Sequence, residues 1–584
     1  MTGTETGITR SEPQLAAVLQ ISFESTAKHL SSVECLYSPY DLDVKTVSKV
    51  TGLRYWTLRV LEECDRVAAD FSADPVHDLR VALRRCRSLA DGMMAMDPDR
   101  NWKAMKKAGK KLFQSLGALR DTQIMMEWIG KLALQHDASE PEMPAQETDP
   151  NQPDAAHNVS VLAGFAAQNP ETNLLHILKS RETVQKSEAR AALEQFDRKQ
   201  WRHWGRSLPA RAARIRPGSA VFKHLALERW TTARELHRRA MRNRSQIALH
   251  TLRIGIKRFR YIVENFLPAE HKAWSNDLKH MQDLLGEVHD LDVLWATALS
   301  THILADEASR KAWHERITEE RQKRIDEYRK NTTGAESLWN VWRSGLPKGE
   351  QIQEFATRRM KLWAKVLDPD FAHSERVARL ALELYDGLQA AGVDRSPDMN
   401  GNGSARTSLY AAALLHDVGK SKGNKGHQKE SLELITQHGT PLGWNELDMQ
   451  RAAIVARFHC GALPTSSHKN LRHLFPDERR LIVRLSAILR LANALDASHD
   501  GHIRRVRIEN TDGAKRRLNG FLRKPAKLAP GQALVIAAEG YAPASGTARA
   551  VAAERYLLET VLRRPVIVKA MGAARHYSPA NPAH

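Results

Sequence analysis

Cysteine is scarce in this sequence: there are four in 584 residues, widely separated and without paired spacing. This excludes a disulfide-stapled scaffold and a zinc ribbon, since both need closely spaced cysteine pairs. No apolar run approaches the roughly 20 residues of a membrane-spanning helix, and residues 1–52 lack a signal-peptide pattern. We therefore expect a cytoplasmic protein without a membrane span.

Aromatic residues are also sparse, at 6% of the chain. The basic segments lack the regular aromatic interleaving on which bases stack, and no base-reading element is recognisable. However, 88 Lys and Arg stand against 68 Asp and Glu, which gives a formal net charge of +20. An excess of this size indicates an acidic partner. Polyphosphate, nucleic acid and an anionic membrane surface are the candidates, and we expect no sequence-specific recognition of nucleic acid.

Two stretches repeat one basic pattern: residues 77–87 read HDLRVALRRCR and residues 250–260 read HTLRIGIKRFR. Five of the eleven positions are identical. On an α-helix, the basic residues of each copy fall within about 80° of one another and the apolar residues fall opposite. The basic sides are His77, Arg80, Arg84 and Arg87, and His250, Arg253, Lys257 and Arg260; the apolar sides are Leu79, Ala82, Leu83 and Cys86, and Leu252, Ile256 and Phe259.

Each basic column lacks the interleaved carboxylates that usually relieve repulsion between like charges one turn apart. A solvated basic face is one interpretation, but two copies in register favour a polyanion site. The register also continues, because aligning Gly117 with Gly286 places Lys103 on Lys272 and Lys110 on Lys279. The sequence therefore predicts two similar helical units, each with a basic helix followed by a Lys-bearing helix that ends near Gly-x-x-basic-Asp.

Both copies resemble the signature of the CHAD domain, the conserved-histidine α-helical domain, over roughly residues 50–345. The resemblance implies a pseudo-symmetric pair of four-helix bundles that binds inorganic polyphosphate in a central basic pore or groove. The implied binding residues are His77, Arg80, Arg84, Arg85, Arg87, Lys103, Lys110, His250, Arg253, Lys257, Arg258, Arg260 and Lys279. Lys257 and His289 stand where arginine is commoner, so they keep donors but lose bidentate grip on phosphate.

The chain divides into a poorly ordered segment 1–45, the CHAD region 46–345, a helical region 350–510 and a small α+β appendage with its tail, 511–584. Residues 136–172 are acidic and proline-rich, and we expect a disordered insertion, with competition for the bound anion as an alternative role. Further helices are predicted over 174–205, 221–245, 307–342 and 548–562, a pause over 209–218, and strands over 503–508, 533–538 and 565–569. The predicted class is mainly α.

A second group of candidate functional residues consists of His373, the dipeptide His416-Asp417 and Asp496, all within segments that are predicted to be helical. Two imidazoles and two carboxylates suit a divalent cation such as Mn²⁺, Mg²⁺, Fe²⁺, Co²⁺ or Zn²⁺. The adjacent His and Asp reach one ion only if the helix is irregular there. His427 and His459 are candidates for a second metal position or a phosphate contact, and ordinary structural histidines are the alternative.

The order and spacing of these residues resemble the HD phosphohydrolase superfamily. Three local sequence motifs, LLHDVG (414–419), RFHCGALP (457–464) and LRLANALDASH (489–499), resemble those of the HD-type C-terminal domain of the Ppx/GppA family. The resemblance covers roughly residues 350–570. This implies metal-dependent hydrolysis of a phosphate ester or anhydride, with His416, Asp417 and Lys420 as catalytic residues. The actin-like domain that carries phosphatase activity in that family has no counterpart in residues 1–350, so its activity is not carried over.

The sequence therefore predicts a polyphosphate-binding protein, with granule association a further expectation, whose HD half hydrolyses polyphosphate or a phosphorylated nucleotide such as (p)ppGpp. Tethering the two functions would raise the substrate concentration at the hydrolytic site. The alternative is a non-catalytic polyphosphate-binding protein whose HD half senses metal or nucleotide. The sequence sets neither the metal nor the oligomeric state.

Overall fold

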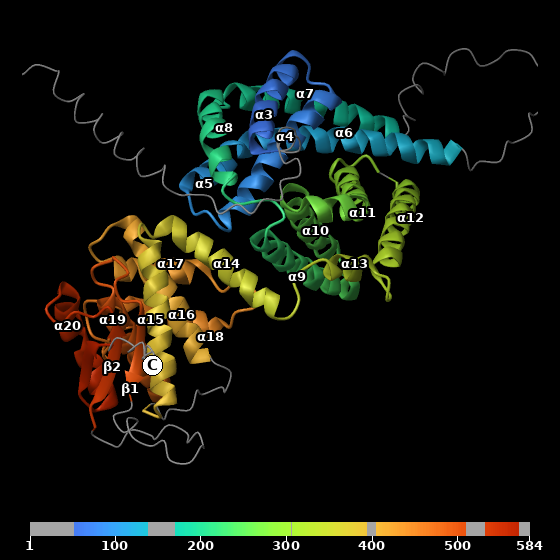
Figure 1. The fold of residues 1–584 in the computed structure, drawn as a ribbon. Helices are drawn as coiled ribbons and strands as arrows, with labels where there is room; N and C mark the ends of the chain where they lie inside the picture. Colours follow the sequence, from blue (N-terminus) through green and yellow to red (C-terminus); the bar gives the residue numbers. More distant parts are fainter. Residues whose placement is uncertain (1–51, 138–169, 305, 394–403, 510–531, 572–584) are drawn as a thin grey trace, which may run out of the picture. The chain divides into compact units, whose positions relative to one another are not determined.

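The computed structural model describes residues 52–137, 170–304, 306–393, 404–509 and 532–571 (Figure 1). The described chain is mainly helical and contains one small sheet of three strands near its C-terminal end. This confirms the predicted fold class. Within these ranges, no helix combines the length and the apolarity needed to cross a bilayer.

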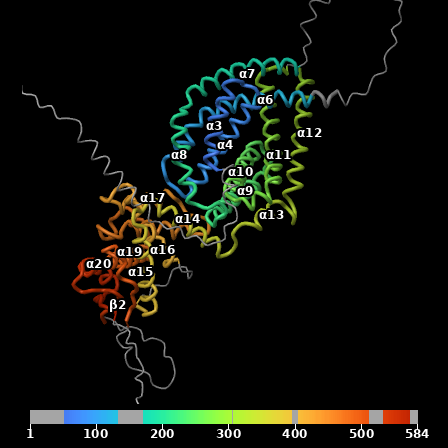
Figure 2. Tube along the Cα trace, turned by 45° about the horizontal axis from the view of Figure 1, so that its top comes forward, coloured from blue at the N-terminus to red at the C-terminus, as the bar shows by residue number. Residues whose placement is uncertain are grey.

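The first basic stretch lies in a group of six helices: α3 (Leu53–Ala69), α4 (Ala73–Met94), α5 (Arg100–Ala108), α6 (Lys110–Asp137), α7 (Pro170–Glu194) and α8 (Arg198–Ala212). The second lies among α9 (Ala220–Asn243), α10 (Gln246–Phe266), α11 (Pro268–Ser300), α12 (Glu307–Thr332) and α13 (Leu338–Ser344). The neighbouring pairs α3 with α4, α6 with α7, α9 with α10, and α10 with α11 pack on one another, and α4 packs directly against α10 (Figure 2). The two basic helices therefore lie side by side.

The predicted burial of α4 and α10 is confirmed. The apolar side of each helix is inaccessible to solvent, with 0% exposure for Leu79, Ala82, Leu83, Cys86, Leu252, Ile256 and Phe259. The two helices approach closely because Gly92 leaves room for the ring of Phe266, which would lie 2.2 Å from a Cβ at that position. Phe266 in turn stacks on Phe222 with ring centroids 4.2 Å apart. One core therefore joins the two repeats.

Several boundaries differ from the prediction. Helices α6 and α11 continue past the Gly-x-x-basic-Asp motifs to Asp137 and Ser300, and Gly117 lies inside α6 where Arg80 packs against it. Helix α8 runs through Pro209, and the helix predicted over 307–342 is interrupted between α12 and α13. Residues 136–137 and 170–172 are helical, so the inserted segment is shorter than predicted. Residues 1–45 and the remainder of the insertion lie outside the described part.

The second half begins with α14 (Glu350–Leu367), α15 (Phe371–Ala390), α16 (Ser404–Leu415), the short 3₁₀ helix η1 (Val418–Lys422), α17 (His427–His438), α18 (Glu446–Arg457) and α19 (Pro476–Leu495). Helix α16 is buried on nearly every side, as expected for an apolar helix at the centre of a domain. It packs against α15, α18 and α19. The end of α16 therefore lies inside the protein, and this is where the His-Asp dipeptide occurs.

The appendage consists of β1 (Arg505–Glu509), β2 (Leu534–Glu539), α20 (Gly546–Leu562) and β3 (Val566–Ala570), close to the predicted ranges. The strand order is β1-β2-β3, with β1 antiparallel and β3 parallel to β2. The parallel pair is joined through α20, which packs on α19 (Figure 1). The appendage is therefore attached to the helix that leads to Asp496.

Candidate functional site

The glycines of the repeated Leu-Gly-x-x-basic-Asp motif lie beside the basic columns of the two repeats. A Cβ at Gly117 would lie 2.9 Å from Nη1 of Arg80, and one at Gly286 would lie 3.9 Å from Nε of Arg253. Each arginine of the basic helix thus lies against the glycine of the following long helix. The close approach of Arg80 explains the glycine at position 117 in the middle of a helix, where glycine costs about 1 kcal/mol relative to alanine. At Gly286 a Cβ would make an ordinary contact, so space does not require the second glycine.

Several donors in this region have no partner among the described residues. Nη1 of Arg80, Nε of Arg84 and the hydroxyl of Tyr261 are buried and make no hydrogen bond. The ring of Tyr261 lies between the two repeats, with the guanidinium of Arg84 at 5.8 Å and the ammonium of Lys257 at 5.9 Å from its centroid. Buried donors without acceptors are costly, so this cluster is suited to receive an acceptor from outside the chain.

The electrostatics of the cluster show how strongly the cations act on one another. Burial, together with Arg253 and Arg84, lowers the pKa of Lys257 to about 8. Burial and Arg253 likewise lower the pKa of His289 to about 4, so this imidazole is neutral at pH 7. Burial raises the pKa of Asp290 to about 6 although Arg253 opposes the shift. These cations lie close together in partly desolvated surroundings, with Asp121 and Asp290 nearby. We call the following residues the cation cluster: Arg80, Arg84, Arg120, Arg253 and Lys257.

The remaining residues of the predicted polyphosphate site divide into engaged and exposed groups. Arg85 forms an ion pair with Glu264 of α10, which also lies 3.9 Å from Arg260. Arg87 donates to the carbonyl oxygen of Lys106 at 3.1 Å. His250 contacts His289, with their Nδ1 atoms 3.3 Å apart. His77, Lys103, Lys110, Arg258 and Lys279 are exposed.

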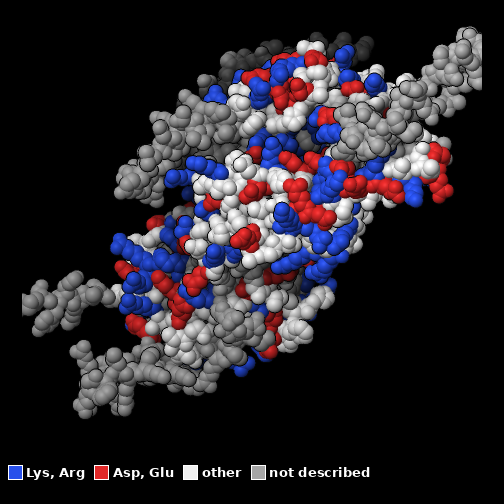
Figure 3. Space-filling model, turned by 90° about the vertical axis from the view of Figure 1, so that its right-hand side faces the viewer, with Lys and Arg blue, Asp and Glu red and all other residues white. Residues whose placement is uncertain are grey.

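The overall charge excess does not define the site by itself. On the face shown in Figure 3, Lys and Arg are intermingled with Asp and Glu. Many basic side chains elsewhere are paired, as in the contact of Arg211 with Asp97 at 2.7 Å. The cation cluster differs because, within the described chain, Arg80, Arg84, Arg253 and Lys257 form no such ion pair. Its remaining member, Arg120, pairs with Glu127 at 3.0 Å.

The His-Asp dipeptide occupies the turn in which α16 ends. Asp417 has φ −104° and ψ 2°, and η1 follows directly, so the irregular geometry that the prediction required is present. Gly419 is essential to this turn, because a Cβ there would lie 2.0 Å from the carbonyl oxygen of His427. The hydroxyl of Ser431 donates to the carbonyl oxygen of His416 at 2.6 Å and accepts from the amide of Gly419 at 2.9 Å. Helix α17 is thereby held on the turn.

Three of the predicted ligands form one group. His373, His416 and Asp417 are buried, and each offers a ligand atom within 4.8 Å of the others. Nδ1 of His416 faces the carbonyl oxygen of Ala413 at 2.8 Å, which leaves Nε2 as a lone-pair donor. Nε2 of His416 and Oδ1 of Asp417 are buried and have no hydrogen-bond partner within the described chain. Unsatisfied nitrogen and oxygen donors of this kind fit a divalent ion.

Asp496 lies behind this group. Its Oδ2 is 2.7 Å from Nδ1 of His373 and accepts from Nε of Arg376 at 2.9 Å. A carboxylate in this position orients the imidazole and raises its basicity toward a metal. Nε2 of His373 lies 2.9 Å from Oδ1 of Asn493, a contact that must give way if His373 is to bind an ion. The structure thus places Asp496 beside His373, and the described carboxylate nearest to His416 is Asp417.

Lys420 points at the same carboxylate. Its ammonium lies 2.5 Å from Oδ2 of Asp417. Burial acts to raise the pKa of Asp417, but His416 and His427 outweigh it and hold that pKa far below its usual range. Asp417 is therefore ionised at all ordinary pH values. The ammonium of Lys420 is close enough to contact an anion that binds next to Asp417.

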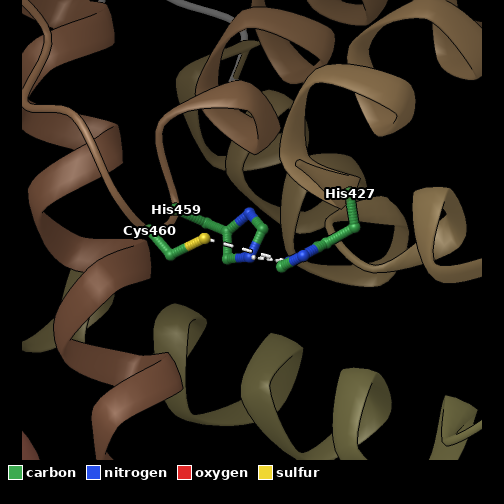
Figure 4. Close-up of side chains that lie close together, drawn as sticks. All are labelled: His427, His459 and Cys460. Carbon is green, nitrogen blue, oxygen red and sulfur yellow. Dashed lines mark hydrogen bonds between the residues drawn. The ribbon is translucent and has the colours of Figure 1, made fainter. Parts of the chain in front are cut away.

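A second group lies on the other side of Asp417 and consists of His427, His459 and Cys460 (Figure 4). The Nε2 atoms of the two histidines are 3.1 Å apart, and the sulfur of Cys460 is 3.8 Å from Nε2 of His427. Asp417 and Cys460 together raise the pKa of His427 to about 10. Burial and His416 lower the pKa of His459. The facing Nε2 atoms of His427 and His459 are therefore suited to share a single cation, either a proton or a metal ion.

Sequence reasoning missed Cys460 because it considered cysteines only as spaced pairs. The signal was present in the dipeptide His459-Cys460, which follows a helix and offers two different donors in succession. It also missed Tyr261, whose counterpart in the first repeat is Ser88, so the register gave no hint of it. Arg490 of α19 donates to the carbonyl oxygens of Phe458 and Gly461, each at 3.1 Å, on either side of His459 and Cys460. These tertiary contacts leave no local pattern in the sequence.

Comparison with known families agrees with this division. A model described as the CHAD domain matches residues 57–299, and one described as Ppx/GppA phosphatase, domain III, matches residues 356–527. Both predicted resemblances are thereby confirmed, and the two matches together indicate a polyphosphate-related protein. A search among curated proteins found no match.

Proposed function

We propose that this protein binds inorganic polyphosphate at the cation cluster and hydrolyses a phosphoanhydride or phosphate ester at the His-Asp turn. The observation that carries the binding half is the convergence of buried donors without described partners from both repeats: Arg80 and Arg84 from the first and Tyr261 from the second. Linear polyphosphate presents closely spaced anionic oxygens without bases, which suits a cluster rich in guanidinium groups and poor in stacking surfaces. Its binding should weaken steeply as salt increases.

The hydrolytic half rests on the group His373, His416 and Asp417, supported by Asp496 and with the expected participation of His427 and His459. A divalent ion bound there would activate a water nucleophile and neutralise charge on the phosphoryl oxygens. Within the chain, Asp496 and the carbonyl oxygen of Ala413 fix the rings of His373 and His416. The ammonium of Lys420, which pairs with the carboxylate of Asp417, would contact the phosphate or donate a proton to the leaving group.

A non-catalytic protein, in which the C-terminal half senses a metal or a nucleotide, is the second candidate. The observation in its favour is that His373 and Lys420 are already engaged, by Asn493 and Asp417. The two candidates differ in one measurable respect, which is release of phosphate.

The test compares the parent protein with Asp417→Asn and with Asp477→Asn, an exposed surface control. Phosphate release from medium-chain polyphosphate is measured with Mn²⁺, Mg²⁺, Co²⁺ or Zn²⁺, and binding of the same polymer is measured in parallel. We expect Asp417→Asn to lower hydrolysis at least about 100-fold without changing polymer binding, since first-ligand loss exceeds the 10–100-fold cost of an outer-shell change. Tight binding without release by the parent, also with (p)ppGpp as substrate, would establish the non-catalytic alternative. Absence of binding would refute the role of the cation cluster.

A further inference from the structure

Helix α8 and the residues that follow it form a basic stretch from which carboxylates are absent. Residues 198–227 contain eight Lys and Arg and no Asp or Glu. The whole chain has 68 Asp and Glu in 584 residues, so about three would be expected in a stretch of this length. The net charge of +20 is therefore concentrated here more than composition alone requires.

Helix α8 separates its residue types onto two opposite sides. At 100° per residue, its basic residues fall within about 100° of one another and its large apolar residues lie opposite. The basic side consists of Lys199, Arg202, His203 and Arg206, all exposed. The apolar side consists of Trp201, Trp204 and Leu208, all buried. The helix is thus fixed with its basic side toward solvent.

Most cations of this stretch are not neutralised within the described chain. Three of the eight pair with carboxylates of other segments, namely Arg198 with Asp65, Arg211 with Asp97 and Lys223 with Glu270. The five that form no ion pair with a described residue are Lys199, Arg202, Arg206, Arg214 and Arg216, all exposed. Like charges one turn apart repel each other, so this row is complementary to an anion from outside the chain.

The basic side of α8 is connected to the cation cluster through α5 and α6. Helix α8 packs on α5 (Figure 1), and a Cβ at Gly109, which joins α5 to α6, would lie 3.6 Å from Trp201. The exposed Lys110 follows at the start of α6. Gly117, which Arg80 approaches, lies seven residues further along α6, or about 10 Å. A polyanion that leaves the cation cluster along α6 therefore meets further cations in the direction of α8.

The character of this surface favours polyphosphate over other polyanions. Single-stranded nucleic acids gain affinity by stacking bases on aromatic side chains, but the tryptophans of α8 are buried. A helix that lies on a membrane inserts its apolar side, but that side of α8 packs on α3, where Nε1 of Trp201 donates to the carbonyl oxygen of Thr57 at 3.1 Å. Polyphosphate requires cations alone.

We propose that the exposed basic side of α8 is a second contact surface for long-chain polyphosphate. It binds the part of a polymer that extends beyond the cation cluster. A chain that contacts both surfaces gains affinity through effective concentration, so the protein prefers long chains to short ones. This inference rests on the proposed function and adds a chain-length preference to it.

The test compares the full-length parent with the triple variant Lys199→Gln, Arg202→Gln and Arg206→Gln. Glutamine is a good helix former and the three positions are exposed, so α8 should stay folded, which circular dichroism verifies. The matched control removes three exposed arginines from the C-terminal half and changes the net charge equally: Arg505→Gln, Arg507→Gln and Arg549→Gln. Affinities for tripolyphosphate and for long-chain polyphosphate are measured at about 50 and about 200 mM salt.

We expect a loss that is confined to the long polymer. If its phosphates behave like those of a single-stranded nucleic acid, each contact contributes about 0.7 to the slope of log affinity against log salt, so three lost contacts remove about 2. Lowering the salt fourfold should then raise the affinity of the parent for the long polymer about 20-fold more than that of the α8 variant. Tripolyphosphate should bind equally to both, and the control should behave as the parent.

Equal binding of the long polymer by the parent and the α8 variant would overturn the inference, as would equal losses for the short and the long polymer. Single-stranded DNA that binds the parent more tightly than polyphosphate, and binds the α8 variant weakly, would assign the surface to nucleic acid instead. The double variant Arg80→Gln and Arg84→Gln separates this inference from the proposed function. If it retains long-chain affinity while the α8 variant loses it, the surface on α8 stands and the role of the cation cluster fails.

Discussion

Lys257 offers the most direct test of polyphosphate binding, because its charge is costly in the free protein. Burial and the nearby Arg253 and Arg84 lower its pKa from 10.5 to about 8. At 1.36 kcal/mol per pKa unit, holding the ammonium charged in the empty cluster costs about 3 kcal/mol. A bound polyanion would remove that cost and return the pKa of Lys257 to its usual range or above.

Binding should therefore weaken as pH rises. At pH 9.5 only about 3% of the free protein carries a charged Lys257, so affinity should be about 30-fold lower than at pH 7. Lys257→Arg should show little change over this range, since guanidinium stays charged. The substitution suits the site, because Arg84 occupies the corresponding position in the first repeat. The hydroxyl of Tyr261 does not interfere, because burial raises its pKa above 10.

Calorimetry in two buffers with different ionisation enthalpies measures the proton directly. At pH 9 the parent should take up about 0.9 proton at Lys257 on binding polyphosphate, and Lys257→Arg should lack this uptake. In the absence of polymer, the unfolded chain holds the Lys257 proton more tightly than the folded chain between about pH 8 and 10.5. The free energy of unfolding of the parent should therefore rise relative to Lys257→Arg by about 3 kcal/mol across this window.

Equal loss of affinity in the parent and in Lys257→Arg would refute the reasoning, because it would assign the pH dependence to other groups. Equal proton uptake by the two proteins would do the same. A flat profile in both would show that Lys257 is solvated in the free protein and that the cluster is not desolvated as described.

Two substitutions on the long helices facing the basic columns test the same cluster. Gly117→Ala should stabilise α6 by up to about 1 kcal/mol yet weaken polyphosphate binding several-fold, because the new Cβ displaces the guanidinium of Arg80. The control is Gly130→Ala in the same helix, where a Cβ would meet no neighbour within 4 Å. Thermal unfolding should show the same gain in stability for this variant, while its polyphosphate binding stays unchanged. Equal losses of binding in the two glycine variants would contradict the explanation. The raised pKa of Asp290, about 6, means that ionising this buried carboxyl lowers the stability of the folded protein as pH rises from about 4 to 6. The substitution Asp290→Asn should therefore increase the free energy of unfolding at pH 7 by about 3 kcal/mol. It should also tighten polyphosphate binding. Urea unfolding that shows no gain at pH 7, or the same gain at pH 4, would count against a buried ionised Asp290.

Much of the fold could be predicted because the patterns are local. The apolar sides of residues 77–87 and 250–260 follow the helical period over three turns, and both are buried as expected. Helix ends were harder to predict. The Lys-bearing helix was predicted to end near the motif that contains Gly117, but α6 continues past it and Gly117 leaves room for Arg80 from another helix. Pro209 likewise lies inside α8. No local rule distinguishes a glycine that ends a helix from one that a neighbour requires.

The candidate sites divide in the same way. The residues His373, His416 and Asp417 were found from their order and spacing, and the structure brings them together. Cys460 was not found, because its value depends on His427, which lies 33 residues earlier and reaches it only through the packing of α17 on the His-Asp turn. The sequence also could not show which of the predicted phosphate-binding cations form ion pairs within the chain. Arg85, for example, pairs with Glu264, which lies 179 residues away.

One physical criterion points to both sites, but it needs a second condition. Buried polar atoms without a described partner occur at Arg80 and Arg84, and again at His416 and Asp417. The indole nitrogens of Trp204, Trp230, Trp339, Trp342 and Trp444 meet the same criterion. They are, however, neutral donors on apolar rings, and the rings of Trp230, Trp339 and Trp342 pack against one another. What marks the two sites is that unpartnered atoms of matching chemistry meet: donors with positive charge at the junction of the repeats, and lone-pair donors around one carboxylate at the His-Asp turn. The first arrangement is complementary to an anion and the second to a cation, which is the combination that the proposed function requires.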